Sequence, residues 1–343
     1  MQSILFIQVS RIGDTLFATP ALRAIAAAWP QARLTVLGHP NRAEVFRHLP
    51  FVAAVGSITK RRAAWRGRFG GPRFDLAFVC GFDPALVAYA LRVAERVVAF
   101  RQKDEALNRR LFQAVPPPPF QSEHAVLQLL RLPAAAGIQP AGLRLAYRCT
   151  AAEQAAARAR LRAAGIGADA APLVGVQMAS FATKSYRDWP AGHFEELCER
   201  IAARWPDARF LIYGGPDERE RTAWLAAQLG PRAADFAGRL SLRETAALMS
   251  LTHLYVGVDT GPTHLMSAFD IPLVGLYHCL STSAHTGPLE HPCAYLLDLP
   301  AGSGCTEASS MGDLTVDAVF AQVERALAAH PHGAAPADGG RTA

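Results

Sequence analysis

Short apolar runs rich in β-branched residues alternate with longer Ala-, Leu- and Arg-rich stretches along most of the chain. The short runs predict strands at 4–9, 34–37, 76–79 and 97–100 in the first half, and at 173–178, 210–214, 254–258 and 273–277 in the second. The longer stretches predict helices at 20–28, 84–91, 123–136, 191–204, 218–229, 242–251 and 262–269. This alternation is typical of an α/β fold with parallel sheets.

The chain has 343 residues, about twice the usual domain length of roughly 100–200 residues. A Gly- and Ala-rich segment at 165–171 precedes a strong strand, so we place a domain boundary there. We expect one Rossmann-like domain at 1–165 and a second at 172–329, with ligands in a cleft where the carboxyl ends of both sheets face each other. Residues 330–343 contain nothing that can form a core, and we expect a disordered tail.

Charge and targeting signals restrict the partners and the compartment. The formal charge is +6, which favours anionic partners. The apolar run after Met1 has no basic residue ahead of it, and no stretch approaches the roughly 20 apolar residues that cross a bilayer. We therefore expect a cytoplasmic protein.

Six cysteines lie far apart, without a Cys-x-x-Cys pair. This spacing indicates neither a zinc knuckle nor a disulfide framework. We expect reduced thiols.

The first polar motif, Arg11-Ile-Gly13-Asp14, follows the first predicted strand directly. Its position places Asp14 at the carboxyl end of the sheet, near the start of the next helix. Two interpretations remain open: Asp14 is a functional carboxylate, or it only caps that helix.

A similar strand, turn and helix in the second half carries Asp259-Thr260-Gly261-Pro262-Thr-His264. Proline suits the first turn of a helix, and the backbone amides of Thr260 and Gly261 would then be available to an anion. Asp259 and His264 add groups that bind hydroxyls or phosphate oxygens. The alternative is a purely structural turn.

A third motif, Thr183-Lys184-Ser-Tyr-Arg187, follows the first strand of the second half. The chain contains 35 lysines and arginines, of which only three are lysines, and Lys184 is one of them. A compact ammonium at this place suggests phosphate neutralisation. The alternative is that Lys184 is a solvated lysine in a loop. Glu218, after the following strand, is either a ribose ligand or an ordinary first-turn acid.

The Walker A, His-Glu-x-x-His, Gly-x-Ser-x-Gly and Gly-x-Gly-x-x-Gly motifs are absent from the sequence. The sequence motifs that usually indicate a kinase, a metalloprotease, a hydrolase or a nicotinamide-dependent enzyme are therefore missing.

Together, Arg11-Ile-Gly-Asp14-Thr-Leu and Val256-Gly-Val-Asp259-Thr-Gly-Pro-Thr-His264 resemble glycosyltransferase family 9, the ADP-heptose:lipopolysaccharide heptosyltransferases of Gram-negative bacteria. The resemblance covers roughly residues 1–325. It implies a GT-B fold, with two Rossmann-like domains that face each other across a cleft. The acceptor would bind the N-terminal domain and the nucleotide sugar the C-terminal one.

The resemblance also implies roles for individual residues. Asp14 would be the catalytic base of an inverting transfer, with Arg11 and Gly13 beside the acceptor. Lys184 would hold the departing diphosphate with the Thr260 and Gly261 amides, so that neither a metal nor another cofactor is needed. The other implied donor contacts are Thr183, Asp259 for sugar hydroxyls, His264, and Glu218 for the ribose.

The loop around Lys184 departs from the family pattern, because relatives usually have Thr-Lys-Arg-Trp-Pro where this chain has Thr183-Lys-Ser-Tyr-Arg-Asp-Trp-Pro190. Arg187 is therefore a second candidate for the phosphate ligand. The segment from Cys293 to Cys305 also differs from that of the best-known heptosyltransferases.

The segment 60–73 holds six cations and no acid, among them Arg61, Arg62 and Arg66. It fits an anionic lipid-linked glycan at the inner face of the inner membrane, or it is a solvated loop. It lacks the motifs of nucleic-acid binding.

Three functions remain open: a lipopolysaccharide-core heptosyltransferase, a relative with another nucleotide sugar or another glycan or protein acceptor, and a non-catalytic nucleotide-sugar-binding protein.

Overall fold

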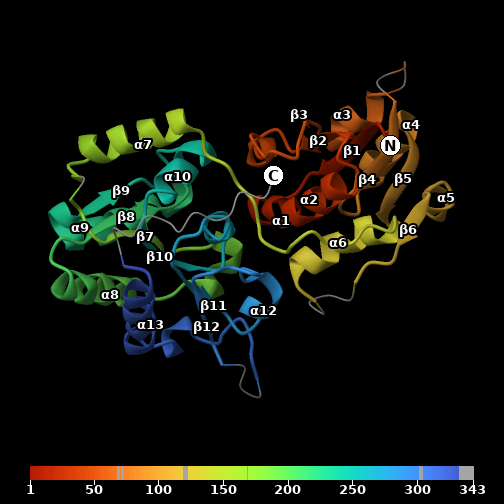
Figure 1. Cartoon of the computed structure of the whole chain (residues 1–343). Helices are drawn as coiled ribbons and strands as arrows, with labels where there is room; N and C mark the ends of the chain where they lie inside the picture. The colour runs from red at the N-terminus through yellow and green to blue at the C-terminus, as the bar shows by residue number, and fades with distance from the viewer. Residues whose placement is uncertain (68–69, 71–72, 119–122, 168, 301–303, 332–343) are drawn as a thin grey trace. The chain divides into compact units, whose positions relative to one another are not determined.

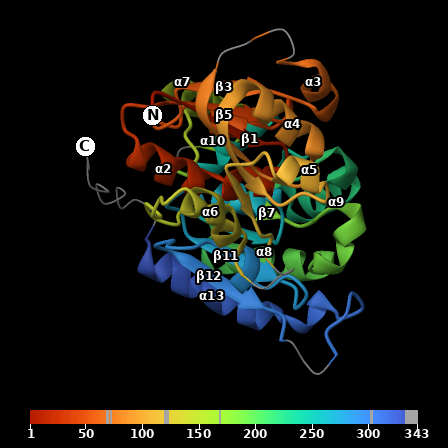
Figure 2. The same ribbon diagram turned by 90° about the vertical axis from the view of Figure 1, so that its right-hand side faces the viewer.

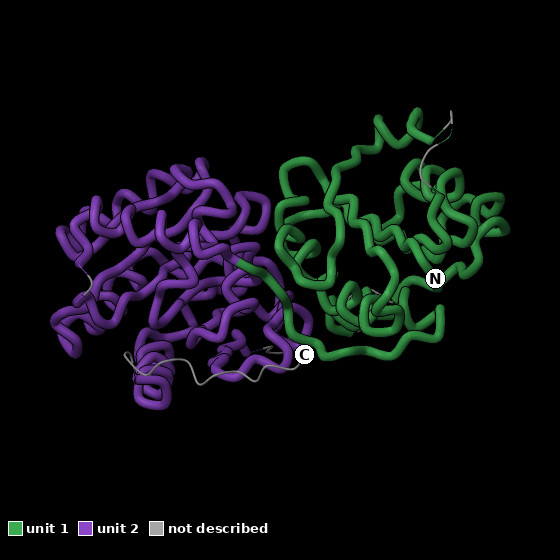
Figure 3. Tube along the Cα trace, turned by 45° about the horizontal axis from the view of Figure 1, so that its top comes forward, with its two compact units in different colours: residues 1–148 green, residues 149–343 purple. Residues whose placement is uncertain are grey.

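The computed structural model describes residues 1–331, except 68–69, 71–72, 119–122, 168 and 301–303. The chain forms two compact units that divide between Arg148 and Cys149 (Figure 3). Each unit is built on one six-stranded parallel sheet with helices beside it (Figure 1). The predicted parallel α/β class is confirmed. The tail expected at 330–343 lies outside the described residues from position 332 onward.

The first unit has the strand order β3-β2-β1-β4-β5-β6. Its strands are β1 (Ser3–Gln8), β2 (Arg33–Gly38), β3 (Ala54–Ser57), β4 (Phe74–Val79), β5 (Ala94–Phe100) and β6 (Gln113–Val115). Its helices are α1 (Ile12–Phe17), α2 (Thr19–Ala28), α3 (Lys60–Trp65), α4 (Pro84–Val93), α5 (Glu105–Asn108) and α6 (Ala125–Ala135), with a 3₁₀ turn η1 (Ala43–Phe46). The order reverses between β1 and β4, which makes the loops after these two strands the expected place for a ligand.

The second unit repeats this topology, with the order β12-β11-β10-β7-β8-β9. Its strands are β7 (Leu173–Gln177), β8 (Arg209–Tyr213), β9 (Ala233–Asp235), β10 (Leu254–Val258), β11 (Leu273–Tyr277) and β12 (Ala294–Asp298). Its α-helices are α7 (Ala151–Ala163), α8 (Ala191–Arg204), α9 (Arg219–Leu229), α10 (Leu242–Met249), α11 (Gly261–Met266), α12 (Ser283–Thr286) and α13 (Val316–Ala329). Its 3₁₀ turns are η2 (Ala182–Arg187), η3 (Pro216–Glu218), η4 (Gly230–Arg232) and η5 (Met311–Asp313). The switch point lies between β7 and β10.

The two faces of the second sheet are packed differently. Helices α8 and α13 lie against each other, and α13 runs beside β10, β11 and β12 (Figures 1 and 2). This face buries aliphatic side chains such as Val174, Val256 and Leu276. Among the described residues, no helix has both the length and the apolar character that crossing a bilayer requires.

The opposite face carries buried tyrosines beside glycines. A Cβ atom on Gly175 would lie 3.0 Å from the ring of Tyr213 and 3.1 Å from that of Tyr255. A Cβ on Gly275 would lie 2.7 Å from the ring of Tyr277, closer than real Cβ contacts. The glycines therefore leave the space that these rings occupy.

The division at 148/149 differs from the boundary expected at 165–172, because helix α7 packs against α10 within the second unit. The Arg243 guanidinium donates to both oxygens of Glu153, at 2.6 Å each. This pairing lowers the pKa of Glu153 to about 2, against the opposing effect of its burial. Glu153 lies in α7 and Arg243 in α10, so this ion pair joins α7 to the second unit rather than to residues 1–148.

Candidate functional site

The turn between β10 and α11 holds its shape through a buried hydroxyl relay. The Tyr255 hydroxyl lies 3.0 Å from Thr263 Oγ1, which in turn donates to the Val258 carbonyl at 2.6 Å. Since that carbonyl can only accept, the Tyr255 hydroxyl donates to Thr263. Thr260 is the N-cap of α11 and Pro262 occupies its first turn, as expected. The turn is thus anchored to the strand that precedes it.

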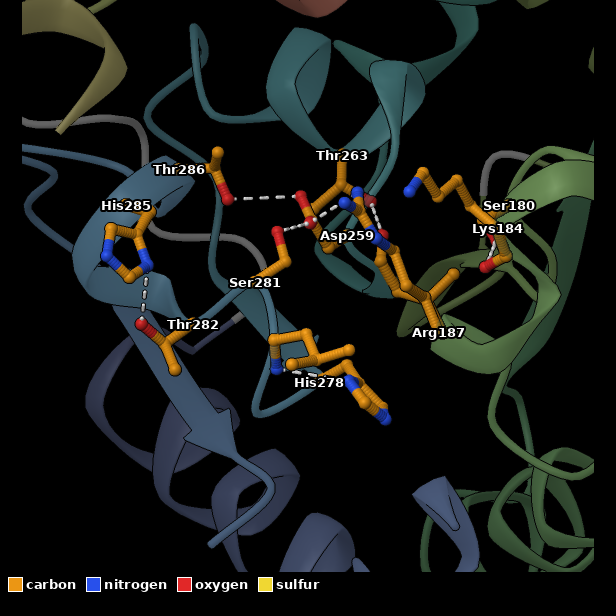
Figure 4. Close-up of polar contacts among 12 residues, drawn as sticks. Ser180, Lys184, Arg187, Asp259, Thr263, His278, Ser281, Thr282, His285 and Thr286 are labelled. Carbon is orange, nitrogen blue, oxygen red and sulfur yellow. Dashed lines mark hydrogen bonds and ion pairs between the residues drawn. The ribbon is translucent and has the colours of Figure 1, made fainter. Parts of the chain in front are cut away.

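Asp259 lies at the end of β10 and is only 1% exposed. Its Oδ2 accepts from Arg187 Nη1 at 2.8 Å and from Ser281 Oγ at 2.7 Å. Its Oδ1 accepts from Thr286 Oγ1 at 3.2 Å (Figure 4). The same oxygen lies 3.3 Å from His264 Nε2. Both carboxylate oxygens therefore already have protein partners, and a sugar hydroxyl that bound Asp259 would have to share or replace one of them.

These partners decide the charge of Asp259. Burial by itself would raise its pKa, but the hydrogen bond and charge of His264, the charge of Arg187 and the Ser281 hydroxyl together lower it. The carboxylate is thus ionised, and it holds Arg187 beside the start of α11.

The loop after β7 is fixed by Asp188. One oxygen of Asp188 accepts from the Ser180 amide at 2.7 Å, and the other pairs with Arg221 Nη1 at 2.6 Å. The Ser180 hydroxyl lies 2.7 Å from the Lys184 carbonyl. Trp189, fully buried, donates to the Leu314 carbonyl at 2.7 Å. The ends of the loop are therefore anchored while Thr183 at its tip is exposed.

Lys184 and Arg187 share one aromatic ring. The Lys184 ammonium lies 5.3 Å from the centre of the Tyr186 ring, and the Arg187 guanidinium lies 5.6 Å from it. Among the described residues Lys184 has no carboxylate partner, whereas Arg187 is paired with Asp259 (Figure 4). The charge of Lys184 thus remains available to an anion, while that of Arg187 is already balanced.

Glu218 lies at the end of η3 and is half-buried. Its Oε2 accepts from the Gly215 amide at 2.5 Å. Burial raises the pKa of Glu218 more than the hydrogen bonds of Gly215 and Gln177 lower it. The residue closes the turn after β8, as first-turn acids do, and it lies at the same sheet edge as Asp259 and the loop after β7.

In the first unit, Asp14 lies in the first turn of α1 and is exposed. The N-cap of this helix is Arg11, three residues earlier, so Asp14 does not occupy the capping position. The Gln8 side chain donates to the Asp14 carbonyl at 2.9 Å, which fixes the backbone here. Gly13 is buried and Arg11 exposed.

The first part of the basic segment, Lys60–Trp65, forms helix α3, and Arg66 is the residue that ends it. The Thr59 hydroxyl accepts from the Arg62 amide and caps the helix. Arg61, Arg62 and Arg66 line a shallow hollow with Trp65, which is 70% exposed. Arg68 lies outside the described residues.

Cys279 and Cys305 form a disulfide, with Cα atoms 6.1 Å apart. The expectation of reduced thiols is therefore wrong for this pair, and it holds for Cys80, Cys149, Cys198 and Cys293. A separation of 26 residues gives no local signal, because the fold brings the two segments together after β11 and β12.

The sequence profile of glycosyltransferase family 9 (heptosyltransferase) matches residues 83–308. The chain belongs to glycosyltransferase family 9. It is 29% identical over 292 residues to lipopolysaccharide heptosyltransferase 1 of Pseudomonas aeruginosa, across 80% of this chain and 78% of the relative.

Two solved structures have a similar fold. The family 9 glycosyltransferase of Veillonella parvula aligns with a TM-score of 0.83 and 16% identity, over 96% of this chain and 98% of that one. The ADP-heptose lipopolysaccharide heptosyltransferase II of Escherichia coli aligns with a TM-score of 0.78 and 20% identity, over 96% of this chain and 99% of that one. The family and the GT-B fold expected from the motifs are confirmed, and the protein is a glycosyltransferase.

Sequence reasoning did not identify three groups that complete this site. Ser281 and Thr286 bind Asp259, and Tyr186 lies beneath both cations. The first two come from the segment after β11, whose Ser/Thr-rich sequence at 281–286 was the one available signal.

Proposed function

We propose that this glycosyltransferase moves a heptose from ADP-heptose to the lipopolysaccharide core with inversion at the anomeric carbon. The observation that carries the proposal is the arrangement at the switch point of the second unit. There Lys184, which has no carboxylate partner in the part of the chain that the structure describes, shares the Tyr186 ring with an Arg187 that is paired with Asp259. The similarity to lipopolysaccharide heptosyltransferases of Pseudomonas aeruginosa and Escherichia coli supports the acceptor class.

On the donor side, Lys184 neutralises the diphosphate as it leaves, with the Thr260 and Gly261 amides as further donors. Fixed charge of this kind supplies the stabilisation that a metal would otherwise give. Asp259 keeps Arg187 and His264 in place and contacts the sugar only by giving up a present partner. Glu218 binds the ribose, and Thr183 contacts the phosphates.

On the acceptor side, Asp14 takes the proton from the attacking hydroxyl. Its place after β1 corresponds to the ligand-binding edge of a Rossmann-like sheet. Arg11 and Gly13 lie in the same turn. The helix α3 cations would meet an anionic glycan at the inner face of the inner membrane, with the enzyme in the cytoplasm.

The donor is tested by thermal unfolding with ADP-heptose, UDP-sugars and GDP-sugars at equal concentration. A ligand that binds only the folded state raises the Tm in proportion to the logarithm of its concentration over its Kd. We expect ADP-heptose to give the largest rise. A larger rise with a UDP- or GDP-sugar would favour the alternative of another nucleotide sugar, and binding without turnover on lipid A–Kdo or heptosyl acceptors would favour a non-catalytic protein or a different acceptor.

The acceptor side predicts that changing Arg61, Arg62 and Arg66 together to Gln raises the acceptor KM and weakens its dependence on salt. Attraction between exposed charges is screened over about 8–10 Å at ordinary ionic strength, so salt should affect the wild type more than the variant. Steady-state kinetics at several salt concentrations measures both effects.

A matched control changes Arg33, Arg47 and Arg109 to Gln, which removes the same charge from other exposed positions of the first unit. Equal behaviour of the two triple variants would contradict the assignment of α3 to the acceptor.

A further inference from the structure

Three potential metal ligands come together from the segments after β11 and β12. His278 follows the strand directly and is fully buried, and Cys279 and Cys305 are partly buried beside it. His278 offers a ring nitrogen and each cysteine a sulfur, and these three atoms lie within 4.8 Å of one another. The disulfide is one arrangement of this cluster.

The environment of His278 fixes which ring nitrogen faces the sulfurs. Nε2 lies 3.0 Å from the Ser309 carbonyl, which can only accept, so Nε2 carries the proton. Nδ1 therefore holds the lone pair, and it lies 3.8 Å from Cys279 Sγ. Histidines that bind metals usually donate their other nitrogen in this way, which sets the tautomer and the ring orientation.

We propose that the reduced cluster of His278, Cys279 and Cys305 binds a thiophilic divalent metal, for which Zn²⁺ is the best match. Zinc bonds of about 2.3 Å to sulfur and 2.0–2.1 Å to nitrogen place tetrahedral ligand atoms roughly 3.5–3.8 Å apart. The Nδ1–Sγ distance already falls at this value. The two sulfurs need only separate from bonding distance, and solvent would supply the fourth ligand.

The chemistry balances with a dithiol reductant. The reductant transfers two electrons and two protons, so the sulfur–sulfur bond breaks, two thiols form and the reductant becomes a disulfide. Metal binding then releases the two thiol protons to solvent, because the ligands are thiolates. The Leu280 amide, which now donates to Nδ1 at 3.1 Å, gives up that contact.

The cluster is joined to the polar groups around Asp259. Two residues after Cys279, Ser281 donates to the Asp259 carboxylate. The rings of Tyr186 and His278 meet edge to face, with centroids 4.8 Å apart. A metal would hold the segment around Cys305 and Ser309 to this turn, as the disulfide does, and it takes no part in the transfer step.

The test titrates the full-length reduced protein with Co²⁺ and then displaces it with Zn²⁺, without oxygen. We expect one equivalent to bind, with the intense thiolate-to-cobalt absorption of a sulfur-rich tetrahedral site, and Zn²⁺ to abolish the spectrum. Protein oxidised with diamide should bind neither ion. A reduced protein without this absorption, or an oxidised protein that binds equally well, would overturn the proposal.

Two variants show whether these residues are the ligands. Cys305→Ser should weaken metal affinity by about 100-fold or more, since loss of an orienting partner alone costs about 10–100-fold. Cys149→Ser, which changes another partly buried cysteine, should bind like the wild type. Circular dichroism verifies that both variants fold, and equal affinities would disprove the assignment. Because the readout is metal binding, a failure here leaves the proposed transferase function unaffected.

Discussion

Replacing Asp14 with asparagine is expected to lower turnover by about 10²–10⁴-fold, the usual contribution of a positioned general base. Asparagine keeps the shape of the side chain but cannot accept the proton from the acceptor hydroxyl. The donor Kd should remain unchanged, because the proposed donor-binding groups belong to the second unit. Single-turnover kinetics together with donor titration separate the two quantities.

Glu95→Gln provides the control, since it removes another exposed carboxylate of the first unit. If Asp14 is the base, the pH profile of the wild type should show an acidic limb that the asparagine variant lacks. Near-normal turnover of Asp14→Asn would assign the residue to the helix start alone.

Lys184→Ala and Arg187→Ala should both impair transfer, but only the second should destabilise the fold. Loss of Lys184 leaves the departing diphosphate without its cation, and removal of one such donor typically costs about 10²–10³-fold in kcat. Loss of Arg187 removes the cation that pairs with the buried Asp259 carboxylate and leaves it with Ser281, Thr286 and His264. Breaking a buried ion pair in this way costs about 3–5 kcal/mol. Urea unfolding and donor kinetics on both variants measure the difference.

A double variant, Arg187→Ala with Asp259→Asn, should recover part of the lost stability, because no uncompensated charge remains. Lys103→Ala, at an exposed lysine of the first unit, is the control for charge alone. If Arg187→Ala abolishes donor binding while Lys184→Ala has no effect, Arg187 is the phosphate ligand, and the charge balance seen at Asp259 must change when the donor binds.

Hydrophobic patterning predicted the inner strands of both sheets and missed the outer ones. All four strands it missed, β3, β6, β9 and β12, lie at sheet edges. An edge strand is covered on fewer sides, so it is short or only half-buried, and it lacks the continuous apolar run of a central parallel strand. The pattern therefore indicates the fold class more clearly than the strand count.

The sequence indicated those parts of the candidate site that lie in a local motif. The turns at Asp14 and Asp259 stand out because a strand, a turn and a helix follow one another in the sequence. The partners of Asp259 do not, since Arg187, Ser281 and Thr286 come from other loops and meet it only after folding. The disulfide was missed for the same reason.

The tyrosine rings and glycines of the second sheet constrain how this domain can vary. Gly175 and the rings of Tyr213 and Tyr255 fill one shared volume across three neighbouring strands. A larger residue at position 175 would therefore need a smaller one at 213 or 255, so these positions are expected to change together. The Tyr255 hydroxyl also hydrogen-bonds to Thr263. A larger side chain in place of Gly175 in β7 would therefore disturb the β10–α11 turn through Tyr255.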